Sequence, residues 1–497
     1  MKYISTRGNY KKVDSAEAIR TGMVPSGGLF VPETIPALSI EEIKDYKDKD
    51  YQEIALDILK RFLVDYSKEE LKESIETAYN KANFPVEEVA PLVKLNDDFY
   101  ILELWHGPTA AFKDMALQLM PRLLQQAIKK LETDSKFVIL VATSGDTGKA
   151  ALEGFKNLEG IEIIVFYPAE GVSKIQEVQM TTTGGSNTHV VAVEGNFDDC
   201  QTAVKSVFGD KEFNHIVNQK SYQFSSANSI NWGRLVPQIV YYFSTYAYLL
   251  RNKAIKAGDK INISVPTGNF GNILAAYYAY RMGLPVNQFI CASNDNKVLA
   301  DFLNTGVYDA NRDFMRTISP SMDILISSNL ERFLFEITGH DSSRINKWYQ
   351  DLKDNNRFEI DKETLKKIQS LFTGGFSTEK EARIAITYAY KGYNYVVDPH
   401  TAVGIDVCIK NFNNNDDNML TVVDSTANPY KFSEAVLEAI TGKLDTDNEY
   451  ENLKKLHKIT GMEIHRGLKE LDKKEIKHKR NCISNEIREE ILDILGI

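Results

Sequence analysis

Residues 106–114 read His-Gly-Pro-Thr-Ala-Ala-Phe-Lys-Asp, and Lys113 is the residue of chemical interest in this stretch. An apolar Ala-Ala-Phe step precedes the lysine at a point where the pattern predicts the start of a helix. Burial lowers the pKa of a lysine, and a neutral amine can form an imine with an aldehyde. The alternative is an ordinary exposed helix lysine, because lysine is mostly found at the surface. Two further loops bear on this choice.

The first loop reads Val265-Pro-Thr-Gly-Asn-Phe-Gly-Asn272. It follows an alternating stretch, residues 260–265, that predicts a strand, and it precedes a predicted helix over residues 273–281. A glycine-bearing turn at the start of a helix presents backbone N–H groups, and Gly268 and Gly271 would let the backbone approach a phosphate closely. An ordinary connection between a strand and a helix is the alternative. An aldehyde that carries a phosphate, such as pyridoxal phosphate, would suit Lys113 and this loop together.

The second loop reads Ala142-Thr-Ser-Gly-Asp-Thr-Gly148, after an apolar run over residues 136–141 that predicts a buried parallel strand. Gly148-Lys149 is reminiscent of a nucleotide-binding P-loop. That interpretation fails because Ala150 stands where a magnesium-binding Ser or Thr is needed, and Thr143 stands in place of the first glycine. The hydroxyl and N–H groups indicate an anion site suited to a carboxylate, with an empty turn as the alternative.

Together these segments resemble threonine synthase, a family of pyridoxal-phosphate enzymes that share the tryptophan synthase β-subunit fold. Further motifs carry the resemblance in family order, and they are typical of the longer branch of the family. They are Tyr3-Ile-Ser-Thr-Arg-Gly8, Gly27-Gly-Leu-Phe-Val-Pro32, Ser225-Ser-Ala-Asn-Ser-Ile-Asn-Trp-Gly-Arg234, Ser321-Met-Asp-Ile-Leu-Ile-Ser-Ser-Asn-Leu-Glu-Arg332, Asp398-Pro-His-Thr-Ala-Val-Gly404 and Ser425-Thr-Ala-Asn-Pro-Tyr-Lys-Phe432.

The resemblance implies roles for cofactor-binding residues. Lys113 would hold the cofactor and then act as the base. Thr426 would hydrogen-bond the pyridine nitrogen, with the adjacent Ser425 as the competitor for this role and a helix N-cap as another use of Thr426. The cofactor phosphate would be bound by Gly268, Asn269, Phe270, Gly271 and Asn272.

Substrate-binding roles follow from the same resemblance. Ser144 and Thr147 would bind an amino-acid carboxylate. Asn228, Ser229 and Arg234 would bind a substrate phosphate, which suits an arginine fork with neutral donors; an exposed helix arginine is the alternative. Asp146 departs from the pattern of compact relatives, which have an asparagine that donates to the cofactor. An ionised aspartate cannot donate, so the role of Asp146 stays open.

Composition is that of an ordinary globular protein, with 43% hydrophobic and 26% charged residues. A net charge of −10 argues against a nucleic-acid partner or an anionic membrane surface. The four cysteines are scattered without metal-ligand spacing, so we expect no metal site and a cytoplasmic location. Residues 235–250 form the longest apolar stretch, but polar residues interrupt it, which predicts a buried helix and not a membrane span.

At 497 residues the chain is too long for one core, and we predict an α/β fold with two mainly parallel α/β domains. Residues 1–95 are predicted to be mostly helical. Residues 96–260 form the first α/β part, with the lysine and the substrate loop. Residues 261–497 form the second α/β part, with the phosphate loop and a helical insertion at about 301–391.

The activity implied by the resemblance converts O-phospho-L-homoserine and water into L-threonine and phosphate. Two alternatives stay open at this point. One is a related lyase that performs the same γ-elimination but releases 2-oxobutyrate. The other is a non-catalytic binding protein on the same fold. The sequence indicates neither an oligomeric state nor an effector.

Overall fold

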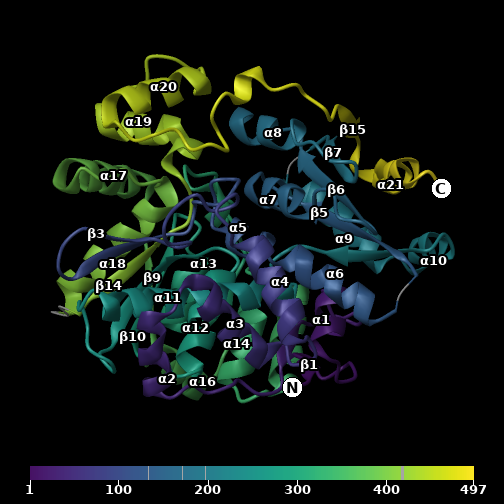
Figure 1. Ribbon diagram of the computed structural model, residues 1–497, viewed down its shortest axis with the longest axis horizontal. Helices are drawn as coiled ribbons and strands as arrows, with labels where there is room; N and C mark the ends of the chain where they lie inside the picture. The colour runs from purple at the N-terminus through teal and green to yellow at the C-terminus, as the bar shows by residue number, and fades with distance from the viewer. Residues whose placement is uncertain (133, 171, 196, 416–418) are drawn as a thin grey trace.

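The computed structural model describes residues 1–132, 134–170, 172–195, 197–415 and 419–497. Two β-sheets with helices packed against them form the body of the molecule, and the chain passes between them more than once (Figure 1). The larger sheet lies at the lower left of the view, and the smaller sheet lies at the upper right beside the C-terminus.

The larger sheet has the strand order β13–β10–β9–β14–β4–β3. Its parallel strands are β4 (Phe99–Glu103), β9 (Ile261–Pro266), β10 (Val286–Ser293), β13 (Phe372–Phe376) and β14 (Thr421–Ser425). An antiparallel strand, β3 (Leu92–Lys94), forms one edge. Every residue of β4, β9 and β14 is buried, as expected for inner strands of a parallel sheet.

The smaller sheet has five parallel strands in the order β15–β7–β6–β5–β8. They are β5 (Lys136–Ala142), β6 (Ile161–Pro168), β7 (Thr188–Val193), β8 (Tyr222–Ser226) and β15 (Arg480–Cys482). The helices of this part are α7 (Asp146–Phe155), α8 (Lys174–Thr181), α9 (Phe197–Gly209) and α10 (Lys211–Gln219). The strand–loop–helix units predicted from the sequence are therefore confirmed in both sheets.

The N-terminal region has more helix than strand, but its helices cover less than half of residues 1–95. It contains β1 (Tyr3–Ser5), α1 (Ser15–Thr21), β2 (Phe30–Pro32), α2 (Ile40–Asp45), η1 (Tyr46–Asp48), α3 (Tyr51–Phe62) and α4 (Lys68–Ala78). Capping boxes at Ser39, Asp50 and Ser67 fix where α2, α3 and α4 begin, because each side chain accepts a backbone N–H of the first turn. α3 packs on the long helix α11 (Trp232–Arg251), whose apolar stretch is buried, as expected.

The remaining elements surround the two sheets. They are α5 (Lys113–Leu117), α6 (Met120–Lys130), α12 (Gly271–Arg281), α13 (Val298–Thr305), β11 (Val307–Asp309), η2 (Pro320–Met322), α14 (Leu330–Ile337), α15 (Ser342–Asn355), β12 (Arg357–Glu359), α16 (Lys362–Gln369), α17 (Glu379–Tyr393), α18 (Pro399–Asn415), η3 (Pro429–Phe432), α19 (Ser433–Thr441), α20 (Glu449–Thr460), η4 (Leu471–Lys473), η5 (Ser484–Glu486) and α21 (Ile487–Leu495). Of these, α21 and η5 pack on α9 of the smaller sheet. Within the described ranges, none of the helices has the length and apolarity needed to cross a bilayer.

Sheet membership does not follow the predicted division at residue 260. β4 lies in the predicted first part but pairs with β14 of the larger sheet, and β15 lies in the predicted second part but pairs with β7 of the smaller sheet. Residues 301–391 are mostly helical, as predicted, yet β13 in this range forms an edge of the larger sheet. The domain boundaries themselves stay a prediction.

Helices α5 and α7 pack closely, and this packing sets the position of two residues of interest, Lys113 and Asp146, at their first turns. A Cβ atom added to Gly154 of α7 would lie 1.8 Å from the Leu117 carbonyl oxygen and 3.1 Å from Pro121 Cγ. Only glycine allows the two helix backbones to come this close, since a backbone atom cannot move aside as a flexible side chain can.

Gly154→Ala is therefore expected to destabilise the protein by about 1–3 kcal/mol or more, the usual cost of overpacking a core. The measurement is the free energy of unfolding in urea. Gly392→Ala is the matched control, because Gly392 lies in α17 with no atom within 4 Å of the added Cβ. The control should be neutral or gain up to about 1 kcal/mol of helix propensity. Equal stability of the two variants would contradict the close packing of α5 on α7.

Candidate active site

The loop that carries Lys113 is joined to the end of β14. The Phe112 N–H donates to the Thr426 carbonyl oxygen at 2.8 Å, and the Asn428 N–H donates to the Ala110 carbonyl oxygen at 3.0 Å. Ala111 and Ala427 form an isolated antiparallel bridge between these hydrogen bonds. The predicted lysine and the predicted pyridine partner are thus brought together by backbone pairing, although 313 residues of sequence separate them (426 − 113).

Lys113 is buried, with only 9% of its surface exposed, so the alternative of an exposed helix lysine is wrong. Its Nζ donates to Asp146 Oδ2 at 3.0 Å and lies 3.5 Å from Ser321 Oγ. Burial lowers the pKa of the Lys113 amine, and the positive charges of Lys431 and Arg234 lower it further against the opposing effect of Asp146. This is the environment that a nucleophilic amine requires.

Asp146 lies between two lysines. Lys113 contacts Oδ2, while Lys431 Nζ lies 2.5 Å from Oδ1, and Gln176 Nε2 donates to Oδ1 at 2.9 Å. Burial alone would raise the pKa of Asp146, but the two lysines hold it well below its usual range. The two lysines thus favour the ionised carboxylate, which accepts hydrogen bonds only and does not donate as the asparagine of compact relatives would.

The loop from Gly268 to Asn272 connects β9 to α12 and is held by its carbonyl oxygens. Ser327 Oγ donates to the Gly268 oxygen at 2.9 Å, and the Asn329 N–H donates to the Asn269 oxygen at 3.1 Å. The N–H groups of the first turn of α12 have no helical partners, and the helix dipole adds positive potential there. The loop is thus arranged as a phosphate site requires.

Gly271 shows that this loop leaves room for a group besides the protein. Its φ is not in the left-handed region, and an added Cβ would meet nothing nearer than Asn329 Nδ2 at 3.5 Å. Neither backbone conformation nor packing in the chain itself therefore demands a glycine here. The open space at Gly271, next to the first turn of α12, is consistent with a bound phosphate.

The side chain of Asn272, the last residue of the predicted phosphate loop, is used within the protein. Asn272 Oδ1 accepts from Tyr242 Oη at 2.6 Å and also from Tyr241, and Asn272 Nδ2 donates to Asp424 Oδ2 at 3.0 Å. Tyr242 Oη also lies 2.6 Å from Asp424 Oδ2, and its one proton serves either Asn272 or Asp424. The Asn272 side chain therefore belongs to a buried network beneath α12, which leaves its backbone N–H for a phosphate.

Ser425 and Thr426 differ in the use of their hydroxyls. Ser425 Oγ accepts from Trp105 Nε1 at 3.1 Å and from Thr401 Oγ1 at 3.0 Å. Thr426 is buried, and among the described residues its hydroxyl has no hydrogen-bond partner. The geometry favours Thr426 as the group that is free to bind a ligand.

Arg234 is a buried cation without a counter-ion. It is 3% exposed, and its Nη1 donates to the Ala227 carbonyl oxygen at 2.6 Å. Its Nε has no partner in the described part of the chain, and no carboxylate there lies within ion-pair distance. Burial lowers the pKa of Arg234 to about 10. A buried charge is costly unless it is paired, so this arrangement indicates an anion supplied by a ligand.

The other predicted substrate residues lie at the ends of β5 and β8. Asn228 and Ser229 are half-buried; Ser229 Oγ lies 3.3 Å from Ser328 Oγ, and the buried Asn228 Oδ1 has no donor among the described residues. Ser144 and Thr147 are also half-buried, at the first turn of α7. All four thus remain accessible beside the buried charges.

Lys149 does not point toward this loop as a P-loop lysine would. Its Nζ lies 2.6 Å from Glu153 Oε1 and donates to Thr183 Oγ1 at 2.8 Å. Thr143 Oγ1, at the position of the missing P-loop glycine, accepts from the N–H groups of Gly145 and Gly148, each at 3.0 Å. The rejection of a nucleotide P-loop therefore agrees with the geometry.

Sequence reasoning assigned no role to Ser321, Lys431 or His400, although all three lie in the quoted motifs. Ser321 Oγ lies 3.3 Å from Asp146 Oδ2, and the Ser321 N–H donates to His400 Nε2 at 3.1 Å. His400 Nδ1 is 2.7 Å from Asp398 Oδ1, so the ring is held with its proton on Nδ1. The motifs marked these residues, but only the fold shows that they converge on Lys113.

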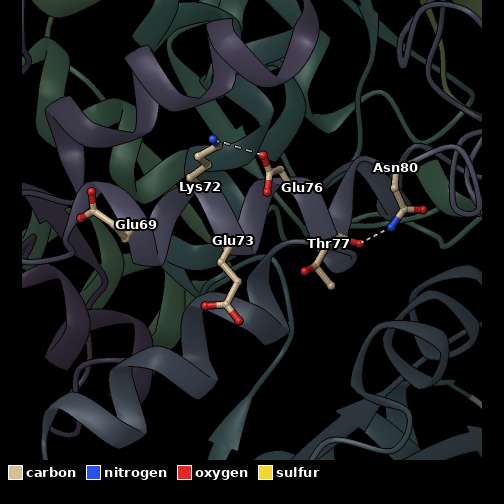
Figure 2. Close-up of a pocket in the computed structure, with 6 residues that line it drawn as sticks. All are labelled: Glu69, Lys72, Glu73, Glu76, Thr77 and Asn80. Atoms are coloured by element: carbon tan, nitrogen blue, oxygen red, sulfur yellow. Dashed lines mark hydrogen bonds and ion pairs between the residues drawn. The ribbon is translucent and has the colours of Figure 1, made fainter.

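A groove on the surface of α4 lies apart from these residues. It is lined by Glu69, Lys72, Glu73, Glu76, Thr77 and Asn80 (Figure 2). Three of the six side chains are carboxylates, and none is a predicted site residue. The groove therefore does not suit an anionic cofactor.

Comparison with known proteins first defines the class. The profile described as "Pyridoxal-phosphate dependent enzyme" matches residues 79–348. The profile "Threonine synthase N terminus" matches residues 2–79, and "Threonine synthase, C-terminal" matches residues 401–481. The chain belongs to the threonine synthase family of pyridoxal-phosphate-dependent enzymes.

Individual relatives agree with the profiles. Threonine synthase of Saccharomyces cerevisiae is 35% identical over 98% of each chain, and that of Pseudomonas aeruginosa is 38% identical over 89% of this chain and 91% of that protein. Human "Threonine synthase-like 1" is 42% identical over 86% of this chain. The chain spans 58% of the length of that human relative.

Solved structures confirm the predicted fold. The pyridoxal-phosphate-bound threonine synthase of Brucella melitensis has a TM-score of 0.88 and 36% identity over 99% of each chain. Threonine synthase from yeast has a TM-score of 0.88 and 34% identity, over 100% of this chain and 99% of that chain. The predicted fold class is confirmed, and the cofactor prediction is confirmed at the level of the family.

The buried network beneath α12 gives a pH prediction. Burial raises the pKa of Asp424 to about 7, against the hydrogen bonds from Tyr242 and Asn272. The unfolded value is about 3.9, so between about pH 4 and pH 7 the folded state binds more protons. The contribution of Asp424 to stability therefore falls as the pH rises through this window.

Asp424→Asn should remove this contribution, because the amide oxygen can accept both hydrogen bonds without a charge. We expect the wild type to lose on the order of 3 kcal/mol more than the variant between pH 4 and pH 8. The measurement is the free energy of unfolding of the cofactor-free protein in urea across this range. Parallel pH curves for the two proteins would mean that Asp424 does not titrate in this window.

Proposed function

We propose that this protein is a threonine synthase that converts O-phospho-L-homoserine and water into L-threonine and phosphate. The observation that carries the proposal is the buried, unpaired Arg234 close enough to Lys113 to lower its pKa. A reactive amine beside a vacant anion-binding cation suits an amino acid that carries a phosphate. Curated threonine synthases at 35–38% identity over most of the chain support the same conclusion.

The cofactor would be pyridoxal phosphate, bound through Lys113. The N–H groups of Gly268, Asn269, Phe270, Gly271 and Asn272 would surround its phosphate. Thr426 would donate its unused hydroxyl to the pyridine nitrogen. When bound, the cofactor supplies an electron sink for negative charge that develops on the substrate. A neutral hydroxyl does not hold a proton on the ring as a carboxylate would, so this sink is moderate.

The substrate would lie between the two sheets. Ser144 and Thr147 would bind its carboxylate with hydroxyls and the N–H groups at the start of α7. Asn228, Ser229 and Arg234 would bind its phosphate, and Arg234 supplies the positive charge that this dianion needs. The two anionic ends of the substrate then fix its Cα with respect to Lys113 Nζ.

Lys113 Nζ would take the proton from Cα and return protons later in the reaction. Its lowered pKa makes the neutral amine available for this work. A proton would then leave Cβ and the Cγ–O bond would break, with the departing phosphate still held by Arg234. A proton would be added at Cγ, the oxygen of water would add at Cβ with its remaining proton passing to phosphate or solvent, and a proton returned to Cα would complete L-threonine. The buried walls of the site would exclude other water during these steps.

A second candidate uses the same chemistry. The chain is also 42% identical to the human "Threonine synthase-like 1" protein, whose name alone does not define a reaction. A lyase would use the same Lys113 and Arg234 to eliminate phosphate but would release 2-oxobutyrate. The two reactions differ only in whether water is added at Cβ.

The four cysteines are buried, and none of them forms a disulfide in the described part of the chain, which supports a cytoplasmic location as part of the proposal. The partner that we propose is the small-molecule substrate. The net charge of −10 gives no support for a nucleic-acid partner.

The product assay tests the proposal directly. Purified protein with pyridoxal phosphate and O-phospho-L-homoserine should release threonine and phosphate in equal amounts, with little 2-oxobutyrate. Lys113→Ala should abolish turnover and the visible absorption band of the lysine-bound cofactor, since no other amine takes its place. Phosphate release balanced by 2-oxobutyrate would establish the lyase, and wild-type turnover by Lys113→Ala would overturn the assignment of this lysine.

Arg234→Ala tests the phosphate-binding role. A lost charge-assisted contact costs on the order of 1.5–3 kcal/mol, so we expect O-phospho-L-homoserine to bind about 10- to 100-fold more weakly. Binding of L-homoserine, which lacks the phosphate, should change little. The spectral titration of the cofactor band with each ligand gives both affinities. Equal losses for the two ligands would assign Arg234 to the carboxylate or to packing.

A further inference from the structure

A second buried lysine, Lys431, lies on the other side of Asp146 from Lys113. Its side chain is fully buried on η3, after the end of β14. Lys431 Nζ lies 2.5 Å from Asp146 Oδ1 and donates to the Thr109 carbonyl oxygen at 3.2 Å. Asn428 begins η3 by accepting the Tyr430 N–H, so the backbone position of Lys431 is fixed by a cap.

The buried Asp146 carboxylate thus forms ion pairs with two lysines, Lys113 and Lys431. Full burial of a lysine is costly, and Asp146 alone would suffice as the partner of Lys113. The presence of Lys431 changes what happens when Lys113 loses its proton. With Lys431, the carboxylate keeps a counter-ion; without it, Asp146 would become an unpaired buried anion. Such an anion would hold the proton on Lys113.

We propose that Lys431 is a positioning residue that supplies the standing counter-charge of Asp146 and thereby allows the Lys113 amine to become neutral. The inference rests on the proposed function, because it assigns to Lys113 the amine that carries the cofactor and moves protons. Lys431 touches Asp146 and the Thr109 carbonyl group, and it acts on Lys113 through them.

Other charged groups face this pair from the neighbouring elements. Arg234 of α11 contributes positive charge, which stays in place when Lys431 is replaced. Asp114 of α5 accepts the N–H and the hydroxyl of Thr109, and burial raises its pKa to about 6. His465 is held neutral, since burial lowers its pKa to about 3. None of these groups contacts Asp146, so the effect of Lys431 is separable from theirs.

The test is the titration of the Lys113 amine in the cofactor-free, full-length protein. Acetic anhydride labels only neutral amines, and the labelled fraction of Lys113, read by mass spectrometry at a series of pH values, gives the midpoint. Lys431→Met removes the charge at similar length and should raise the midpoint by about one unit or more. Lys431→Arg keeps the charge and should stay near the wild type. At a fixed pH below the midpoint, Lys431→Met should label Lys113 about tenfold more slowly.

Lys149→Met is the matched control. Lys149 is also a buried lysine, at 8% exposure, and it pairs with Glu153 on the same helix as Asp146. Its replacement should leave the midpoint of Lys113 unchanged. The double variant Asp146→Asn/Lys431→Met has no carboxylate to neutralise, so its midpoint should fall below that of Lys431→Met. This variant also keeps the test decisive if Lys431→Met fails to fold.

The proposal would be overturned if the titration midpoint of Lys113 were unchanged in folded Lys431→Met. It would also be overturned if the midpoint in the double variant stayed above that of the wild-type protein. A second measurement, the pH profile of the rate at which pyridoxal phosphate develops its visible band, should shift in the same direction. The labelling needs neither cofactor nor substrate. It therefore reports on Lys431 even if the product assay assigns a different reaction to the protein.

Discussion

The contact between Lys113 and Asp146 joins the two halves of the molecule, and the site depends on it. Lys113 begins α5 beside the larger sheet, whereas Asp146 begins α7 of the smaller sheet. The close approach of these helices at Gly154 fixes the distance between the two first turns. In low-dielectric surroundings a small change in this distance alters both pKa values, so backbone packing sets the chemistry of the amine.

The segment from Ser319 to Arg332 links the other parts of the site to this contact. Ser321 lies within hydrogen-bond distance of Lys113 and Asp146. Ser327 and Asn329 donate hydrogen bonds to the carbonyl oxygens of Gly268 and Asn269. The hydroxyls of Ser328 and Ser229 also contact each other. Contacts with other parts of the chain hold the C-terminal end of this segment. Arg332 donates to the carbonyl oxygens of Phe30 and Ile230, and Glu331 forms an ion pair with Arg7. The N-terminal region therefore contributes to the site through support of this segment and not through a ligand contact.

The sequence predicted the strands, the helices and the loops of the site because local patterns report them: apolar runs for inner strands and glycines at strand ends. It did not predict Lys431 as a partner of Asp146, since 285 residues separate them (431 − 146) and a lysine in a loop is usually exposed. It also gave no sign that the Asn272 side chain lies in a buried network with Tyr241, Tyr242 and Asp424. Local sequence patterns do not predict which distant residues a polar side chain will contact in the folded protein. The division at residue 260 failed to separate the sheets for a related reason, because β15 returns to β7 from the end of the chain.

The cofactor phosphate and the substrate phosphate that the site is proposed to bind would be held by different kinds of interaction. The turn from Thr267 to Asn272 contains no lysine or arginine, so its attraction comes from N–H groups and the α12 dipole. A carboxylate beneath that helix would oppose an anion, and the raised pKa of Asp424, about 7, means that its charge is reduced near pH 7 and largely absent at lower pH. The substrate phosphate would meet the full charge of Arg234 instead, whose cost of burial is relieved only when that anion arrives. In the proposed site, cofactor retention would depend on the link to Lys113 and a preformed backbone turn, whereas substrate binding would depend on an unpaired charge, and this difference would allow the substrate phosphate to leave while the cofactor stays.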